Sequence, residues 1–200
     1  MLYQFTTQFT FLIGHRGVGK SALLKRIQEN SNNVDCFDLD LEIENEEGLK
    51  VTDIFHQQGE DYFRKCELKV LNKIINYQKN KINKTCVALG AGFVLESLNP
   101  LKESLSVQCI FVSRYTDILG RMFSNRPRLL PELDDPLQEY KIKYKQRQEL
   151  FLRFSNIIYH IPEGDIGIDH NFIKIESNIL CGQFDFENVF YTIKDQNELN

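Results

Sequence analysis

The strongest chemical signal in the sequence is a glycine-rich segment at residues 14–21, which reads GHRGVGKS. It satisfies the pattern G-x-x-x-x-G-K-[ST], whose glycines let successive backbone N–H groups point at phosphate oxygens. Lys20 is placed to reach the β- and γ-phosphates of a nucleotide, and Ser21 to offer a hydroxyl to a bridging magnesium ion. The alternative is a chance glycine turn. The segment predicts a nucleotide-phosphate loop, formed by Gly17, Val18, Gly19, Lys20, Ser21 and Ala22.

Two carboxylates follow the next short apolar segment, Val34–Phe37. Because alternate residues of an extended chain share a face, we expect Asp38 and Asp40 to project to the same side at the end of a strand. One carboxylate would serve magnesium and the other an acceptor hydroxyl. The alternative is the acidic first turn of a helix, which the glutamates that follow at 42, 44, 46 and 47 also favour.

Arg64 is flanked by Glu60 and Glu67 at helical spacing, so an ordinary surface ion-pair ladder is one interpretation. The other is a guanidinium braced by carboxylates for a bidentate grip on a substrate carboxylate. The segment Gly90-Ala91-Gly92 puts permissive backbone directly after a strand, where a ligand approaches closely. An ordinary turn between strand and helix remains the competing interpretation of this segment.

These residues lie between short apolar runs that alternate with helical patterns. Strands are expected at Phe9–Ile13, Val34–Phe37, Thr85–Leu89, Val107–Val112 and Ile157–Ile161, and helices at Ala22–Ile27, Glu60–Tyr77 and Phe186–Ile193. This alternation predicts an α/β fold with a mainly parallel sheet covered on both faces. Residues 124–138 break the periodicity with Asn, Arg and three prolines, which is typical of a long loop that acts as a lid.

Composition limits the class of protein. A chain of 200 residues with 42% apolar and 26% charged residues fits a single domain. The net charge of -4 and the gathering of basic residues around a phosphate loop, without interleaved aromatics, argue against nucleic-acid binding. The five scattered cysteines, the absence of a basic n-region at the start and the lack of an apolar run of membrane-spanning length indicate a cytoplasmic protein.

Taken together, the segments from Phe9 to about Ile161 resemble the shikimate kinase family. The order that carries the resemblance is the phosphate loop, Phe37-Asp38-Leu39-Asp40, Gly59-Glu60, Phe63-Arg64, the Gly90 turn, Arg126-Pro127 and Arg147. The resemblance implies a three-layer P-loop kinase fold with a five-stranded parallel sheet and a lid. It also implies transfer of the γ-phosphoryl group of ATP to the 3-hydroxyl of shikimate, with Mg²⁺ as cofactor, by a monomer that binds a small-molecule substrate.

The same resemblance assigns roles to individual residues. Asp40 would hold the acceptor hydroxyl and take its proton, and Asp38 with Ser21 would position magnesium. The shikimate carboxylate would lie between Arg64 and Arg147, with the ring against Gly90, Ala91 and Gly92. Arg126 would meet the phosphates from the lid, and Arg121 would lie near the adenine. Lys20, Asp40 and Arg126 form the implied catalytic set.

The sequence departs from the family pattern at several points. Ala91 stands where the family has the middle of three glycines, Arg128 is an extra arginine in the lid, and residues 148–151 read QELF instead of NPLY. Two alternatives therefore stay open: a kinase for another polyhydroxylated acid, and a catalytically silent nucleotide-binding relative. Residues 163–200 form a C-terminal extension without an assigned role.

Overall fold

The computed structural model describes residues 7–114 and 146–161, and every structural statement below concerns these two stretches. Residues 146–154 are helical and precede the last strand. The strands are β1 (Phe9–Ile13), β2 (Val34–Asp38), β3 (Lys84–Ala88), β4 (Val107–Arg114) and β5 (Ile157–Ile161), and the helices are α1 (Lys20–Asn30), α2 (Leu39–Glu47), α3 (Val51–Gln58), α4 (Glu60–Gln78), the short 3-10 helix η1 (Leu95–Leu98) and α5 (Asn99–Ser104).

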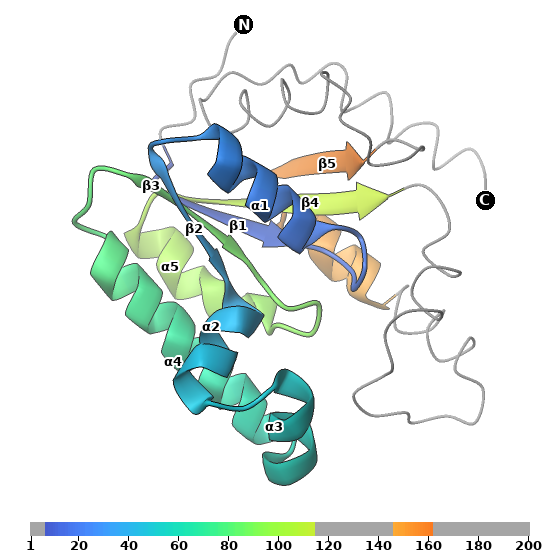
Figure 1. Cartoon of the computed structure of the whole chain (residues 1–200). Coiled ribbons are helices and arrows are strands. Elements are labelled where there is room, and N and C mark those ends of the chain that lie inside the picture. The colour runs from blue at the N-terminus through green and yellow to red at the C-terminus, as the bar shows by residue number, and fades with distance from the viewer. Residues whose placement is uncertain (1–6, 115–145, 162–200) are drawn as a thin grey trace, which may run out of the picture.

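The five strands form one parallel sheet in the order β2-β3-β1-β4-β5. The first strand is central, so its carboxyl end lies beside those of β3 and β4, and the chain returns to each parallel neighbour through helical connections (Figure 1). The predicted α/β class and five-stranded parallel sheet are confirmed. In such sheets, ligands bind at the carboxyl ends of the strands, and the glycine-rich loop follows the carboxyl end of β1.

Two apolar clusters cover the two faces of the sheet. On one face, Phe9, Phe11 and Ile13 of β1 pack with buried residues of α2, α3, α4 and the helix over 146–154. On the other face, Leu12 of β1 packs against the buried stripe of α1. Side chains of successive strand residues point to opposite faces, and all five residues of β1, of which only Thr10 is polar, are buried between the two clusters.

The sequence-based boundaries agree with the structure within a few residues for every strand. The strands at Phe9–Ile13 and Ile157–Ile161 match without change, and the predicted helix Glu60–Tyr77 is α4. The predicted helix Phe186–Ile193, the lid at 124–138 and the extension at 163–200 lie outside the described residues.

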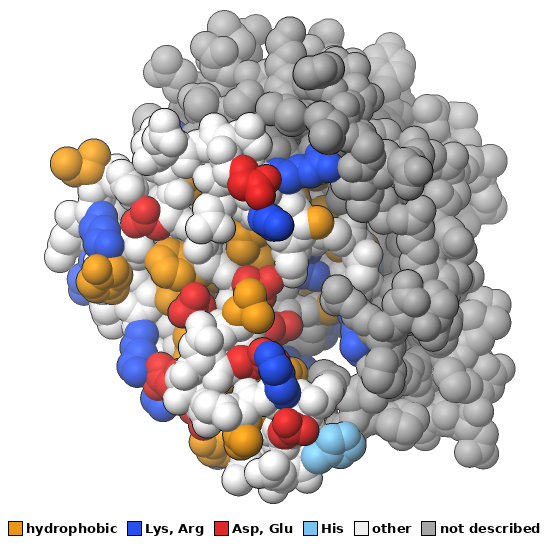
Figure 2. Space-filling model, in the orientation of Figure 1, with side chains coloured by type: hydrophobic (Ala, Val, Ile, Leu, Met, Phe, Trp, Pro, Cys, Tyr) orange, Lys and Arg blue, Asp and Glu red, His pale blue; other side chains and the backbone are white. Residues whose placement is uncertain are grey.

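Charged side chains of both signs are interspersed over the exposed side of α2 and α4 (Figure 2). Glu46 of α2, for example, forms ion pairs with Lys69 and Lys73 of α4, whose Nζ atoms lie 2.8 and 2.7 Å from its Oε1. Exposed pairs of this kind contribute little free energy individually, and they leave the apolar cluster beneath them as the main stabilising contact.

The described cysteines are free thiols, and three of them, Cys66, Cys86 and Cys109, are buried as expected. None of the helices over 7–114 and 146–161 has both the length and the apolarity needed to cross a bilayer.

Candidate active site

The glycine-rich loop joins β1 to α1, as the sequence predicted. Gly17 and Gly19 adopt φ values of 80° and 108°, in the left-handed region that a residue with a Cβ rarely adopts. The Lys20 Nζ donates to the carbonyl oxygens of Gly14 at 2.7 Å and His15 at 2.9 Å. The lysine therefore lies across its own loop, and its ammonium group stands over the N-terminal end of α1, where an anion is favoured.

Asp38 and Asp40 are not alternate residues of one extended segment, so that expectation was wrong. Strand β2 ends at Asp38, and α2 begins at Leu39. The Asp38 carboxylate caps the helix, because its Oδ1 accepts a hydrogen bond of 3.2 Å from the backbone N–H of Asp40. The helix-start alternative was therefore correct about the backbone. Both carboxylates still lie at the carboxyl end of β2.

The Asp40 carboxyl group is set apart by its environment. Burial raises the pKa of Asp40, and the neighbouring Asp38 raises it further, whereas Lys20 and Arg64 oppose the shift. Within the described residues, Asp40 Oδ1 is buried without a hydrogen-bond partner. A buried oxygen of this kind is suited to accept a hydrogen bond from a hydroxyl group.

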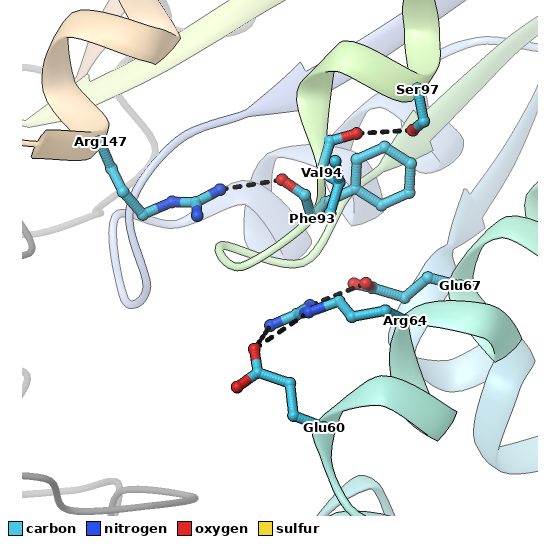
Figure 3. A network of polar contacts seen from close by, with 7 residues as sticks. All are labelled: Glu60, Arg64, Glu67, Phe93, Val94, Ser97 and Arg147. Atoms are coloured by element: carbon cyan, nitrogen blue, oxygen red, sulfur yellow. Dashed lines mark hydrogen bonds and ion pairs between the residues drawn. The ribbon is translucent and has the colours of Figure 1, made fainter.

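Arg64 is held on two sides by carboxylates of its own helix (Figure 3). Its Nη2 lies 2.7 Å from Glu60 Oε1 and its Nη1 lies 2.7 Å from Glu67 Oε2, which confirms the expected ion pairs. Its Cζ also lies 5.6 Å from the centroid of the Phe63 ring. The guanidinium is thus fixed in one orientation beside the glycine turn.

Glu67 is a functional candidate that the sequence reasoning treated only as an ion-pair partner. Its side chain is 1% exposed, and its Oε1 is buried without a partner among the described residues. Burial raises the pKa of Glu67 to about 7, although the ion pair with Arg64 opposes the shift. The available signal was its position, because Glu67 falls in the buried stripe of α4, where a charged residue is unusual.

The turn after β3 lies directly against these side chains. A Cβ at Gly90 would stand 3.0 Å from Glu67 Oε1 and 3.1 Å from Asp40 Oδ1. A Cβ at Gly92 would overlap the Arg64 guanidinium, at 2.9 Å from its Cζ. Neither glycine has a φ in the left-handed region, so both are required here for space. Ala91, between them, also lies in the turn.

Arg147 approaches the same turn from the helix over 146–154. Its Nη2 donates to the Phe93 carbonyl oxygen at 2.9 Å (Figure 3). Its Cζ also lies 5.4 Å from the Phe151 ring centroid. Burial lowers the pKa of Arg147, and the neighbouring positive charge of Arg64 lowers it further. Two guanidinium groups that repel each other across a glycine turn form a favourable place for an anion.

The structure therefore brings together candidates from four separate segments: the phosphate loop, the start of α2, α4 and the turn with its facing helix. Glu67 interacts electrostatically with Asp40, Arg64 and Arg147, which ties the acidic and basic groups to one region. Arg121 and Arg126, the other two expected site residues, lie outside the described residues.

The proposed magnesium ligands have suitable chemistry. Ser21 is the exposed second residue of α1 and Asp38 ends β2, and both offer the hard oxygen donors that Mg²⁺ prefers. The described residues contain no cluster of three or more acidic, His or Cys side chains able to hold a metal alone. That arrangement fits an ion held by one or two protein oxygens together with nucleotide phosphates and water.

Comparisons with known proteins identify the family of this chain. Residues 16–166 match the family model described as shikimate kinase. The chain is 35% identical over 147 residues to a shikimate kinase from Sulfurihydrogenibium, which covers 74% of this chain and 84% of that protein. It is 33% identical over 172 residues to a shikimate kinase from Aquifex aeolicus, covering 86% and 98% of the two chains.

Solved structures give the same result for the fold. The crystal structure of the Aquifex aeolicus shikimate kinase aligns with a TM-score of 0.60 at 27% identity, over 87% of this chain and 99% of that one. A shikimate kinase from Acinetobacter baumannii in complex with shikimate aligns with a TM-score of 0.69 at 23% identity, over 90% and 97% of the chains. With this match over most of its length, the chain belongs to the shikimate kinase family.

Proposed function

We propose that this protein phosphorylates the 3-hydroxyl of shikimate, using ATP as the phosphoryl donor. The observation that carries the proposal is the arrangement around the glycine turn. The guanidinium groups of Arg64 and Arg147 lie near Gly92 and Phe93, and the buried Asp40 carboxylate lies against Gly90. A hydroxylated ring acid needs this division, with cations for its carboxylate and an acceptor for its hydroxyl.

The acceptor would bind with its carboxylate between the two arginines. Arg64 is already oriented by Glu60 and Glu67, so little side-chain entropy is lost when it accepts a further carboxylate. The ring would lie against the backbone of Gly90, Ala91 and Gly92, which passes close to the Asp40 carboxylate and the Arg64 guanidinium. The membership of the family and the related structure that holds shikimate support this placement.

ATP would bind with its phosphates in the loop of residues 14–21, against the N-terminal end of α1. Lys20 would exchange the carbonyl oxygens of Gly14 and His15 for phosphate oxygens. Ser21 and Asp38 would hold Mg²⁺, which neutralises charge on the phosphates. The roles of Arg126 on the phosphates and Arg121 near the adenine belong to the same proposal.

The chemical step needs positioning more than covalent assistance. The acceptor oxygen forms a bond to the γ-phosphorus while the bond from that phosphorus to the β–γ bridging oxygen breaks, and ADP leaves. The hydroxyl proton passes to the Asp40 carboxylate. Because burial raises the pKa of Asp40, its ionised form is a stronger base than an exposed aspartate. Lys20 stabilises the negative charge that shifts toward the leaving ADP.

The finer parts of the proposal concern the whole chain. We infer a single kinase domain with a lid at 124–138, acting as a monomer in the cytoplasm without nucleic-acid or membrane partners. Light scattering on the purified protein, with and without ATP and shikimate, measures the oligomeric state. A stable dimer under both conditions would overturn the inference of a monomer.

The activity is tested by coupling ADP release to a spectrophotometric signal in the presence of magnesium ATP. Shikimate is compared with quinate, with gluconate and with no acceptor. Arg64→Ala removes the carboxylate contact, and Lys65→Ala is the matched control, since Lys65 is the exposed next residue of the same helix. We expect release that depends on shikimate, is lost in Arg64→Ala and persists in Lys65→Ala.

Other outcomes separate the alternatives. Release that depends on quinate or gluconate but not on shikimate would indicate a kinase for a different hydroxy acid. ATP binding without release for any acceptor would indicate a silent nucleotide-binding relative.

A further inference from the structure

We propose that His15 is a positioning residue that sets the phosphate loop against Arg147 through a part-buried hydrogen bond to Gln148. The inference rests on the proposed function, in which Arg147 binds the acceptor carboxylate. It assigns to His15 a role in acceptor binding, although His15 itself lies in the nucleotide loop.

The contact joins two segments that are far apart in the chain. His15 Nε2 lies 3.1 Å from Gln148 Oε1, and the His15 residue is 5% exposed. With the proton on Nε2, the imidazole donates to the amide oxygen. The edge of the ring also meets the Phe151 ring, with centroids 4.9 Å apart and an interplanar angle of 88°. His15 thus contacts one face of the helix over 146–154 at two successive turns.

The same helix face carries Arg147. The Arg147 guanidinium lies over the Phe151 ring and donates to the Phe93 carbonyl oxygen, just beyond the Gly90–Gly92 turn. A continuous series of contacts therefore runs from the phosphate loop through His15, Gln148 and Phe151 to Arg147. Movement of the His15 ring would shift the helix turn from which the guanidinium extends.

The imidazole is kept in one protonation state. The pKa of His15 is lowered to about 4, mainly by burial and also by the positive charges of Lys20 and Arg147, whereas the hydrogen bond to Gln148 opposes the shift. The ring is therefore neutral around neutral pH. We therefore expect His15 to donate the same hydrogen bond throughout the neutral pH range and not to change its charge there.

A buried histidine that only fills space is the competing explanation, and it makes a different prediction. A phenylalanine at position 15 would keep the aromatic contacts with Phe151 and Phe111 but lose the donor to Gln148. If packing alone matters, that variant behaves like the original protein. If the hydrogen bond positions Arg147, acceptor binding weakens while the loop still binds ATP.

The experiment measures kcat and KM for shikimate and for ATP, together with the melting temperature, in the full chain. The variants are His15→Phe, His15→Gln, Gln148→Leu and the control Gln146→Leu, whose side chain is exposed on the same helix. We expect His15→Phe and Gln148→Leu to lower kcat/KM for shikimate about fivefold, the size of one neutral hydrogen bond, with KM for ATP changed less than about twofold. His15→Gln restores a donor and should restore most of the loss, and Gln146→Leu should have no effect.

A second arm asks whether His15 acts through Arg147. We expect His15→Phe to lower kcat/KM for shikimate in the original protein but to add nothing in the Arg147→Ala background, because residues that act as one unit are not additive. The same loss in both backgrounds, or a rise confined to KM for ATP, would overturn the inference.

The single variants show which hypothesis has failed. If Arg147→Ala itself leaves kcat/KM for shikimate unchanged, the proposed acceptor site is wrong. If Arg147→Ala lowers it and His15→Phe does not, only the role of His15 is wrong. Should His15→Phe fail to fold, Gln148→Leu carries the same comparison from the other partner.

Discussion

Replacing Gly92 by alanine tests the acceptor site with a single methyl group. The new Cβ would overlap the Arg64 guanidinium, at 2.9 Å from Cζ and 3.0 Å from Nη1. Gly92 has no left-handed φ, so the backbone accepts alanine without strain. The methyl group therefore acts on the position of Arg64 and leaves the chain path as it is.

The expected magnitude follows from what Arg64 must give up. Its Nη1 is held by Glu67 at 2.7 Å and its Nη2 by Glu60 at the same distance, so moving away from the methyl group disturbs both contacts. Hydrogen bonds to charged groups contribute about 1.5–3 kcal/mol each. Loss of one such bond to the shikimate carboxylate lowers kcat/KM for shikimate by about 10- to 150-fold. The Glu60 partner of Arg64 is half-exposed, so the displaced guanidinium can exchange that ion pair for water, and the free energy of unfolding should change by less than about 1 kcal/mol.

Steady-state kinetics with shikimate varied at saturating ATP, and then with ATP varied, measure this effect. Gly48→Ala is the matched control because Gly48 ends α2 with a φ of 67° and has nothing within 4 Å of its Cβ position. Alanine there is strained by about 1–2 kcal/mol but touches no site residue. The two variants should show opposite patterns. Gly92→Ala should lower kcat/KM for shikimate and keep the stability of the original protein, whereas Gly48→Ala should lower the stability and keep kcat/KM for shikimate.

One result would refute the reasoning. If Gly92→Ala retains kcat/KM for shikimate within about twofold while folding normally, the position of Arg64 does not govern acceptor binding. An equal loss for ATP and shikimate would also count against it, because the methyl group faces only the Arg64 side of the site.

Three further predictions concern single charged groups. Asp40→Asn should lower kcat by at least about 100-fold, since the base is lost, and an unchanged kcat would remove Asp40 from the chemistry. In thermal melts at pH 8 the variant should be as stable as the original protein or more stable, because the raised pKa of Asp40 makes its ionised form unfavourable in the fold. Lys20→Met should abolish turnover and weaken ATP binding in calorimetry, because no other group is proposed to reach the β- and γ-phosphates from the loop; full activity would contradict this role of the loop. The pKa of Glu67 is raised from 4.5 to about 7, so the native protein binds a proton more readily than the unfolded chain, and its stability falls by at most about 3 kcal/mol as pH rises between these values. Glu67→Gln should lose this dependence in thermal melts at pH 5 to 8. An identical dependence in the variant would show that the ion pair with Arg64 keeps Glu67 ionised.

The sequence was sufficient for the sheet because the strands are buried on both faces. Runs such as Phe9–Ile13 are apolar apart from Thr10, and the helices between them show a period near 3.6, so the alternation of strands and helices and the parallel sheet follow from patterns that local sequence carries. The phosphate loop was equally accessible, because its glycines and Lys20 stand at fixed offsets.

The part that could not be predicted depends on contacts between distant segments. The Asp38–Asp40 segment was misjudged because an aspartate that ends a strand is also a good N-cap, and only the backbone distinguishes the two. The reason for Gly90 and Gly92 was also hidden, since it is the nearness of Asp40, Glu67 and Arg64 that excludes a Cβ. The contact between His15 and Gln148 spans 133 residues and has no local signature.

The most direct test of the central claim is to identify the product. The purified protein is incubated with magnesium ATP and shikimate, and the product is examined by phosphorus–proton correlation NMR. We expect one new phosphomonoester, coupled to the ring proton at carbon 3, formed in equal amount with ADP. A phosphate on a different hydroxyl, or ADP formed without any phosphorylated shikimate, would contradict it.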